Sequence, residues 1–441
     1  MEIKKLISKI YFDKASLKIC DYDKSRKFFI FEGCMAVGIS SLTSGAFLAG
    51  FTSYLGASDE FAGIIGAIPA LTGIIQLFSS IIVERLERRK LLVSIGYFIS
   101  RMLLSIMVLI PVYFQGTEAR LTALAVIYGM AYLISAFIES STSNWMVDLT
   151  PEHLRAAYFA RKDAVSLGFI TMLTIIMGKV MDLFRNYNND YGGFLVIGIF
   201  VFIMTILDTS FLFRTKEPAG HREIVKLKLK DTIIIPFKNV KYRKVIILFL
   251  LYNIGLQIAG PFVSIYMVTG LKLDYTYIMV MGVLTSVARM FSAKYWGRIA
   301  DKKSWYFSTK LSITILAFCH AAWFLVDNRT VWVLLPIMNV FGGIAWSGVT
   351  ISIFNIQFVM APEEGRTMYL GASAALGGLA GFMSTFIGSM IIKNLKSFSI
   401  DFAGFNICNM QIVFALSGII LLITALYVHM SISQNQYKLK I

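Results

Sequence analysis

The sequence predicts an all-α membrane protein that crosses the bilayer twelve times, in two pseudo-symmetric bundles of six helices. Composition is the first observation behind this fold class: hydrophobic residues make up 57% of the 441 residues, charged residues only 15%, and the mean hydropathy is +0.69. The second is that apolar runs recur along the whole chain, each near the roughly 20 residues that a helix needs to cross a ~30 Å hydrocarbon core. This composition excludes a soluble domain.

The predicted spans follow one another along the chain with short connections between most of them. We place them at residues 28–55, 61–83, 91–114, 120–146, 164–184, 192–213, 245–269, 275–296, 306–326, 331–357, 369–392 and 410–432. This arrangement gives a tail (1–27), a first bundle (28–213), a linker (214–244), a second bundle (245–432) and a second tail (433–441).

A signature of five residues follows the fourth span of each predicted bundle and is the third observation. Asn144, Pro151, Glu152, Arg155 and Tyr158 in the first bundle match the spacing of Asn355, Pro362, Glu363, Arg366 and Tyr369 in the second. Five matched residues at fixed spacing indicate a duplicated six-span half. Paired halves in a membrane are typical of proteins that open a central site alternately to the two sides.

The charge of the chain is strongly basic, with a formal net charge of +16. In the predicted topology most Lys and Arg residues lie in the N-terminal tail, the loops that follow even-numbered spans, and the C-terminus. Because positive loops stay on the cytoplasmic side, we expect a multi-pass protein of the cytoplasmic membrane with both termini inside. The basic surface then faces anionic lipid headgroups, so nucleic acid is not an expected partner.

The linker 214–244 is the longest predicted connection and contains Pro218, Gly220 and Pro236 among many basic residues. Its segment IVKLKLKDTIII alternates apolar and basic residues, which in water would suit a strand. Beside a membrane we expect the segment to lie along the inner leaflet and to anchor the linker.

The loops after the second and eighth spans carry related motifs. The first reads SIIVERLERRK and includes Ser80, Glu84, Arg85 and Arg88; the second reads YWGRIADKK and includes Gly297, Asp301 and Lys302. Together they resemble the loop signature of the major facilitator superfamily, a Gly, three residues, an Asp and then basic residues. The first copy departs from it at Ser80 and Glu84, and the second lacks the later Gly and basic residues.

This resemblance covers nearly the whole chain and implies a cytoplasmic gate. Glu84 would face the start of the eleventh span near Arg366, and Asp301 the start of the fifth span near Arg155, where helix N-termini favour carboxylates. The alternative is positive-inside topology with ordinary helix capping. The full set of gate candidates is Glu84, Arg85, Arg88, Arg155, Gly297, Asp301, Lys302 and Arg366.

Among the ionisable residues within predicted spans, where a charge is costly and suggests a function, we single out five. They are Glu32, Arg101, Glu139, Asp208 and Arg289. The resemblance implies that spans 1, 4, 7 and 10 line a cavity, which makes Glu32 and Glu139 the candidates for proton coupling or substrate binding. Arg289 on a flanking span would bind an anionic group or complete a gate, whereas we interpret Arg101 and Asp208 as structural. A static buried ion pair is the alternative for all five.

Polar and aromatic residues recur on the presumed lining helices. The candidates are Ser40, Ser44, Tyr132, Ser143, Asn253, Gln257, Asn339 and Trp346. Trp346 is predicted near the bilayer midplane, where its ring would stack on a sugar or another planar solute, or pack against a neighbouring helix. The serines have the alternative role of holding helices together.

No nucleotide-binding loop, catalytic residues or metal-ligand spacing is recognisable, so we expect neither an enzyme nor a cofactor. The resemblance implies a secondary transporter for a small polar or mildly amphipathic organic solute, acting as a monomer by alternating access, with proton coupling resting on Glu32 and Glu139. One alternative is an exporter of drugs or lipids, although the fifth span lacks the Gly-Pro-x-x-Gly-Gly element of many drug antiporters. Another is a receptor or assembly factor that does not transport. The Pro-Glu-Ser-Pro-Arg element of sugar porters is also absent after the sixth span, where only Glu217 and Pro218 match it.

Overall fold

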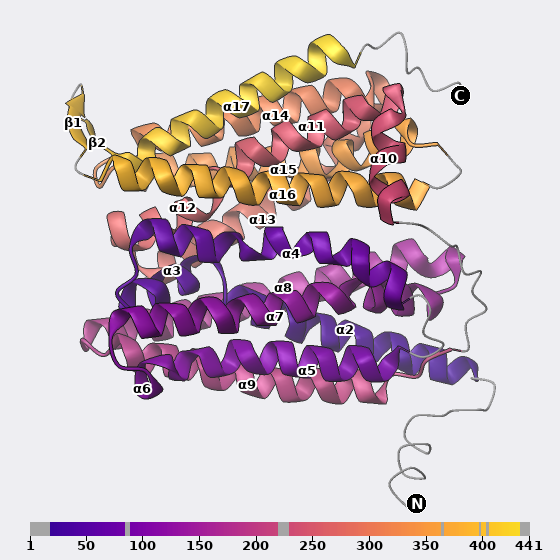
Figure 1. Ribbon diagram of the computed structural model, residues 1–441, viewed down its shortest axis with the longest axis horizontal. Coiled ribbons are helices and arrows are strands. Elements are labelled where there is room, and N and C mark those ends of the chain that lie inside the picture. The colour runs from indigo at the N-terminus through magenta and orange to yellow at the C-terminus, as the bar shows by residue number, and fades with distance from the viewer. Residues whose placement is uncertain are drawn as a thin grey trace, which may run out of the picture. The chain divides into compact units, whose positions relative to one another are not determined.

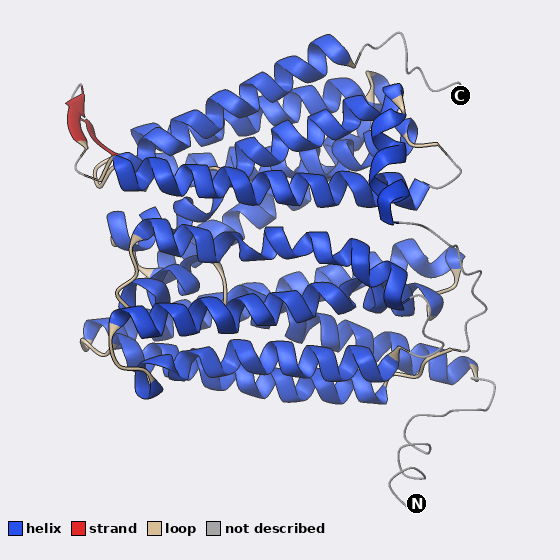
Figure 2. Cartoon of the chain, viewed as in Figure 1, coloured by secondary structure: helices blue, strands red, loops and turns tan. Residues whose placement is uncertain are grey.

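Helices make up nearly all of the structure, a computed structural model that describes residues 18–83, 89–218, 229–362, 366–396, 398–402 and 405–432 (Figure 2). Long apolar segments form helices in a membrane because only a helix satisfies every backbone hydrogen bond within one segment. The fold is therefore described by its helices, labelled in Figure 1.

The N-terminal helices extend from Ile19 to Arg214. They are α2 (Ile19–Leu42), α3 (Gly45–Tyr54), α4 (Asp59–Val83), α5 (Lys90–Ile106), the 3₁₀ turn η1 (Met107–Leu109), α6 (Ile110–Tyr113), α7 (Thr117–Asp148), α8 (Glu152–Asn186) and α9 (Asp190–Arg214).

The C-terminal elements extend from Leu229 to Ser431. They are α10 (Leu229–Lys238), α11 (Val240–Gln257), α12 (Gly260–Ile265), the π-helical turn η2 (Tyr266–Gly270), α13 (Tyr275–Lys302), α14 (Trp305–Ala322), the 3₁₀ turn η3 (Trp323–Leu325), α15 (Val331–Met360), α16 (Arg366–Asn394), β1 (Ser399–Phe402), β2 (Phe405–Cys408) and α17 (Asn409–Ser431).

Each predicted span coincides with a helix. In the described residues ten helices are long and apolar enough to cross a membrane, and α2 with α3 forms an eleventh if this pair is one span bent by 41°. Helix α4 covers the remaining predicted span, 61–83. The largest differences are at the starts of α2 and α8, which begin at Ile19 and Glu152, well before the predicted residues 28 and 164. Polar residues extend a helix beyond the hydrocarbon core, where hydropathy no longer marks it.

The first span is broken between α2 and α3. Gly45 has a φ of 56°, a left-handed conformation that a residue with a Cβ rarely adopts. The Thr43 hydroxyl donates to the Ile39 carbonyl at 2.8 Å and so satisfies a carbonyl near the end of α2. The break therefore combines a glycine with a local side-chain cap, neither of which alters the hydropathy of the span.

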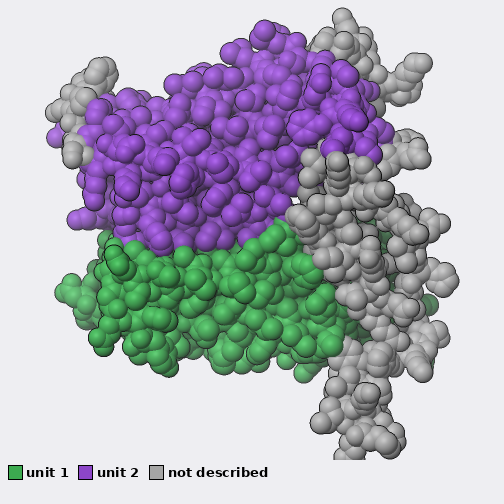
Figure 3. Space-filling model, in the orientation of Figure 1, with its two compact units in different colours: residues 1–56, 75–227 green, residues 57–74, 228–441 purple. Residues whose placement is uncertain are grey.

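The chain divides into two compact units, coloured separately in Figure 3. The first contains residues 1–56 and 75–227, and the second contains residues 57–74 and 228–441. The division near residue 227 falls within the predicted linker. Helix α4 contributes to both units, because its first part groups with the C-terminal helices and its last part with the N-terminal ones.

A buried tyrosine of the repeated signature occupies a similar place in each unit. Tyr158 on α8 donates through its hydroxyl to the Arg26 carbonyl on α2 at 3.0 Å. Tyr369 on α16 accepts at its carbonyl from the Tyr242 hydroxyl on α11 at 2.9 Å, and the two rings meet edge to face. The first and fifth spans of each half are thus joined at the same repeat position, which supports the duplication.

Two local features were not part of the sequence prediction. Residues 229–238, which overlap the end of the alternating linker segment, form the helix α10, and α10 contacts α16; the position of the segment along the inner leaflet stays a prediction. Before α17, β1 and β2 pair as an antiparallel hairpin (Figure 1), which was not predicted because four-residue strands are too short for a periodicity to be read.

Candidate functional site

Arg101 is the centre of a buried charge cluster in the first unit. Its side chain extends from α5 and forms ion pairs with Glu32 of α2, at 3.2 Å from Nη2 to Oε1, and with Asp208 of α9. All three residues are buried, Arg101 at 7%, Glu32 at 4% and Asp208 at 0% exposure. Since an unpaired charge is very unfavourable within a membrane, these contacts fix the rotation of three helices about their axes.

Tyr97 connects this cluster to Glu139 on α7. Its hydroxyl donates to Glu139 Oε2 at 3.1 Å, and the Arg101 guanidinium lies over its ring at 4.2 Å from the centroid. Tyr97 and Arg101 are four residues apart on α5 and therefore share a face. Glu139 is exposed in the first unit, in contrast to the buried Glu32 and Asp208. The cluster thus has one sealed end and one accessible end.

The charges of this cluster do not balance. It brings together three carboxyl groups, those of Glu32, Glu139 and Asp208, with the single guanidinium of Arg101. Two ionised carboxylates beside one guanidinium already carry a net negative charge, and a third adds repulsion in a medium of low dielectric constant.

Only part of this cluster was predicted from the sequence. Glu32 and Glu139 were candidates for proton coupling or substrate binding, whereas Arg101 and Asp208 were interpreted as structural. The structure pairs Arg101 with both Glu32 and Asp208. Tyr97 was missed altogether; the signal available was its spacing of four residues from Arg101, which puts both on one helical face.

Arg289 lies in the second unit and has a neutral partner. Its Nη2 donates to Thr350 Oγ1 on α15 at 3.2 Å, and Thr350 in turn donates to the Trp346 carbonyl at 2.6 Å. Arg289, Thr350 and Trp346 are all exposed within this unit. We refer to these three residues as the α13–α15 polar surface. It presents a guanidinium, a hydroxyl and an aromatic ring together.

Asn339 lies about two helical turns before Trp346 along α15. Its Oδ1 accepts from Thr285 Oγ1 of α13 at 2.6 Å, and its Nδ2 donates to the Leu335 carbonyl at 2.7 Å. Because its amide is engaged on both sides, Asn339 joins α13 to α15. A role in contacting a solute stays a prediction.

The other lining candidates lie in both units and have local partners or open surroundings. Ser44 donates to the Ser40 carbonyl at 2.7 Å, and Asn253 donates to the Phe249 carbonyl at 2.9 Å. The remaining positions are as follows: Tyr132 packs its ring on Tyr128, Ser143 is exposed on α7, and Gln257 lies against Gly381 of α16. Nothing in these contacts distinguishes a solute-binding role from helix packing.

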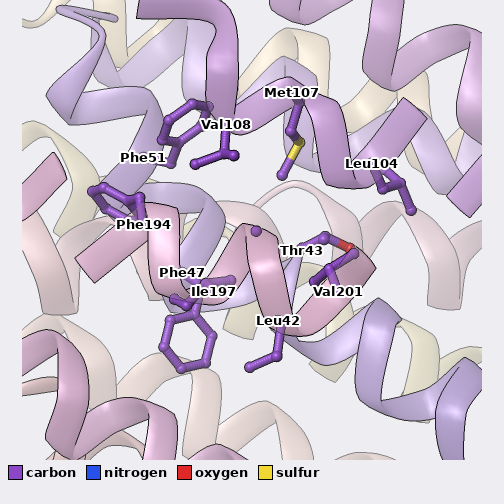
Figure 4. A pocket seen from close by; sticks show the side chains of 11 residues that line it. Leu42, Thr43, Phe47, Phe51, Leu104, Met107, Val108, Phe194, Ile197 and Val201 are labelled. Carbon is purple, nitrogen blue, oxygen red and sulfur yellow. The ribbon is translucent and has the colours of Figure 1, made fainter. Parts of the chain in front are cut away.

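A small apolar cavity lies beside the break in the first span (Figure 4). Its volume is about 20 Å³, and Leu42, Phe47, Phe51 and Phe194 are among the residues that line it. This volume suffices for about one water molecule. The cavity is therefore too small to hold an organic solute.

The gate candidates are only partly described. Glu84, Arg85 and Arg88 lie outside the described residues. Arg155 is exposed and donates from Nε to the Thr150 carbonyl at 3.2 Å, while the Arg366 guanidinium lies over the Phe358 ring at 5.4 Å. Asp301 and Lys302 are exposed at the end of α13, and Gly297 has open space around its Cα. The gate stays a prediction.

Arg89 forms a second charge cluster that sequence reasoning missed. It is 2% exposed, and its Nη2 lies 2.6 Å from Asp148 Oδ2 at the end of α7. Glu217, beyond α9, accepts from the backbone N–H groups of Arg89 and Lys90 at 2.8 and 3.1 Å, where α5 begins. A carboxylate at this position satisfies free N–H groups of the helix and complements its dipole. Glu217 therefore ties the start of the linker to the first unit.

Replacing Glu217 by Ala is expected to destabilise the protein by about 1–3 kcal/mol, because two backbone donors and Arg89 lose their acceptor. Thermal unfolding of the purified protein measures this as a lower Tm. The matched control is Glu118→Ala, which removes a carboxylate from the first turn of α7. Equal Tm values for Glu217→Ala and the wild type would contradict this role.

The long apolar helices and the buried charges define a multi-pass membrane protein with an internal polar site. The sequence matches the Major Facilitator Superfamily over residues 30–385, most of its length. The chain belongs to this superfamily, and it is a membrane transporter, not an enzyme. A comparison with curated protein sequences finds no match.

Solved transporters share the fold at low sequence identity. A variant of the nucleoside transporter NupG superposes with a TM-score of 0.65 and 13% identity, over 93% of this chain and 99% of that one. A D-xylose-proton symporter superposes with a TM-score of 0.64 and 14% identity, over 94% and 99%. The predicted fold class, an all-α protein with the superfamily's two-bundle architecture, is therefore confirmed.

Proposed function

We propose that this transporter couples the movement of a small polar organic solute to a flow of protons. The charge cluster around Arg101 carries the proposal, because it pairs two buried carboxyl groups with one guanidinium and reaches a third, exposed carboxyl group, that of Glu139, through Tyr97. Glu139 is the accessible carboxyl and exchanges the proton, while Glu32 and Asp208 hold Arg101. Tyr97 links the two parts, so protonation of Glu139 changes the interactions of the Arg101 helix.

The α13–α15 polar surface is our proposed place for the solute. An aromatic ring beside a hydroxyl and a guanidinium suits a planar or ring-shaped solute that carries several hydrogen-bonding groups. The named transporters of similar fold act on a nucleoside and on D-xylose, which belong to this chemical class. We propose that both termini face the cytoplasm, as the basic loops predict, and that a monomer suffices for transport.

Uptake into liposomes tests this function. The purified protein would be reconstituted and offered radiolabelled nucleosides and sugars, with and without an inward proton gradient. Accumulation that requires the gradient and stops with a protonophore is the expected result. Uptake that is independent of the proton gradient would overturn proton coupling. Transport of lipophilic cations or lysolipids, but of no sugar or nucleoside, would favour an exporter instead.

Replacing Glu139 by Gln is expected to abolish accumulation driven by the proton gradient while solute exchange across the liposome membrane continues. The amide keeps the hydrogen bond with Tyr97 but cannot exchange a proton. The measurement compares gradient-driven uptake with counterflow in the same liposomes. Glu118→Gln, on the same helix but outside the cluster, is the control. Gradient-driven accumulation that persists in Glu139→Gln would assign the proton to another group.

A further inference from the structure

A wide groove runs along the second unit between α13, α14 and α15. Its volume is about 470 Å³, and its walls include Ala288, Ser292 and Ile299 of α13, Leu311 and Ile315 of α14, and Ile344 of α15. All of these positions belong to helices that are long and apolar enough to cross a membrane. None of the residues that line the groove belongs to the charge cluster or to the α13–α15 polar surface.

The floor of the groove offers no free hydrogen-bonding group. Trp296 forms this floor with 3% exposure, and its Nε1 donates to the Ile344 carbonyl at 2.7 Å. Gly348 lies directly against the indole, which leaves no room for a side chain at that position. The Ser292 hydroxyl donates to the Arg289 carbonyl at 3.1 Å. Because the Trp296 indole N–H and the Ser292 hydroxyl are both engaged, the floor of the groove suits an apolar ligand.

The length of the groove fits one leaflet of a bilayer. Along α13 it extends from Ala288 to Ile299, which is about 16 Å at 1.5 Å per residue. This is about half of a hydrocarbon core of ~30 Å. Phe291 and Tyr295 on its rim are 68% and 63% exposed, as expected for side chains that face acyl chains.

Basic residues gather where the groove ends, at the connection from α13 to α14. They are Arg298, Lys302, Lys303 and Lys310, and within the described part of the chain none of them forms an ion pair with a carboxylate. The ammonium groups of Lys303 and Lys310 lie over the Phe307 ring at 4.3 and 5.7 Å. Asp301 is the one acidic residue from 298 to 310. The end of the groove is therefore complementary to an anion.

We propose that this groove binds an anionic phospholipid, with one acyl chain along Trp296 and the phosphate against Lys303 and Lys310. Apolar lining, a length of one leaflet and an unpaired basic end are the three features that such a lipid matches. Basic pockets at the ends of membrane helices on the cytoplasmic side bind lipid headgroups in this way. The inference does not depend on the transported solute or on protons.

Native mass spectrometry of the full-length protein in an equimolar mixture of phosphatidylglycerol and phosphatidylcholine with identical acyl chains tests the proposal. We expect the wild type to retain one phosphatidylglycerol in preference to phosphatidylcholine. Each basic residue near the headgroup contributes about fivefold in affinity, so Lys303→Gln with Lys310→Gln is expected to lower the preference about thirtyfold. The control pair Lys24→Gln with Lys27→Gln, which removes two exposed charges from α2, is expected to leave the preference unchanged.

Two further variants test the acyl-chain site itself. Leu311→Trp fills the groove from α14 and Ser292→Phe fills it from α13, so retention of both lipids is expected to fall. A control pair that lowers the preference as much as the Lys303 and Lys310 pair would overturn the proposal, since the effect would then belong to the whole basic surface. Undiminished lipid retention by both Leu311→Trp and Ser292→Phe would overturn it as well.

Discussion

Replacing Arg101 by Ala is expected to destabilise the protein by about 3–5 kcal/mol, because it leaves the carboxyl groups of Glu32 and Asp208 buried without a cation. The two carboxylates would then have to take up protons or draw water into the bundle. Either change loosens the packing of α2, α5 and α9, which meet at this cluster. Thermal unfolding in detergent measures the effect as a large fall in Tm. Arg120→Ala, at the partly exposed start of α7, is the control.

A compensated variant separates the structural from the functional contribution of Arg101. In this variant all three charged residues are replaced by neutral ones, as Arg101→Met, Asp208→Leu and Glu32→Gln. Because no unpaired charge is left in the bundle, the variant is expected to recover most of the stability that Arg101→Ala loses. If the cluster serves proton coupling, this variant folds but fails to accumulate solute along a proton gradient. If this variant recovers both stability and gradient-driven uptake, the charged residues of the cluster have only a structural role. A Tm for Arg101→Ala equal to that of the control would contradict the buried ion pairs.

The membrane spans could be predicted because each depends on one local property, the hydropathy of its own residues. A run of about 20 apolar residues lowers its free energy by entering the bilayer as a helix, whatever its neighbours are. The repeated signature predicted the duplication, and Tyr158 and Tyr369 each lie where the first and fifth spans of a half meet, although Tyr158 bonds through its hydroxyl and Tyr369 through its backbone carbonyl. The ends of helices were less predictable. Polar first turns such as that of α8 carry no hydropathy signal, although Pro151 directly before it marks a suitable start.

Side-chain partners between helices were not predictable, because they depend on how each helix is rotated about its axis. Arg101 and Asp208 were interpreted as structural because their spans belong to the presumed outer scaffold, and the structure shows that Arg101 pairs with Asp208 and also with the candidate Glu32. Glu217 is 128 residues from Arg89 in the chain, and the contact of its carboxylate with the start of α5 follows from the path of the chain after α9. Contacts between residues so far apart in the sequence arise from the packing of whole helices and cannot be predicted from a short motif.

Replacing Gly63 by Leu is expected to break the packing of the first part of α4 within the second unit. A Cβ at Gly63 would overlap the ring of Phe262, which is fully buried and cannot move aside. At Gly378 of α16 a Cβ would lie 2.7 Å from the Ala70 carbonyl oxygen, so both contacts require glycine. Overpacking of this kind costs about 1–3 kcal/mol.

Accessibility of a cysteine next to α4 measures this effect. Ser389 is 4% exposed, and its hydroxyl donates to the Glu60 carbonyl at 3.0 Å. In a background with Cys408→Ser, a Ser389→Cys reporter is expected to react faster with a membrane-impermeant thiol reagent once Gly63 is Leu. Gly73→Ala is the matched control on the same helix, because nothing lies within 4 Å of a Cβ there.

Helix α4 belongs partly to each unit, and this affects transport. Its residues up to 74 group with the second unit and the rest with the first, with Pro69 inside the helix as a place where it can bend. Any movement of one unit against the other must therefore release these contacts or bend α4. Gly63→Leu is expected to reduce transport together with the faster labelling, and adding Phe262→Leu is expected to restore both in part. Unchanged labelling in Gly63→Leu would show that the α4 contact with Phe262 is absent from the protein in the membrane.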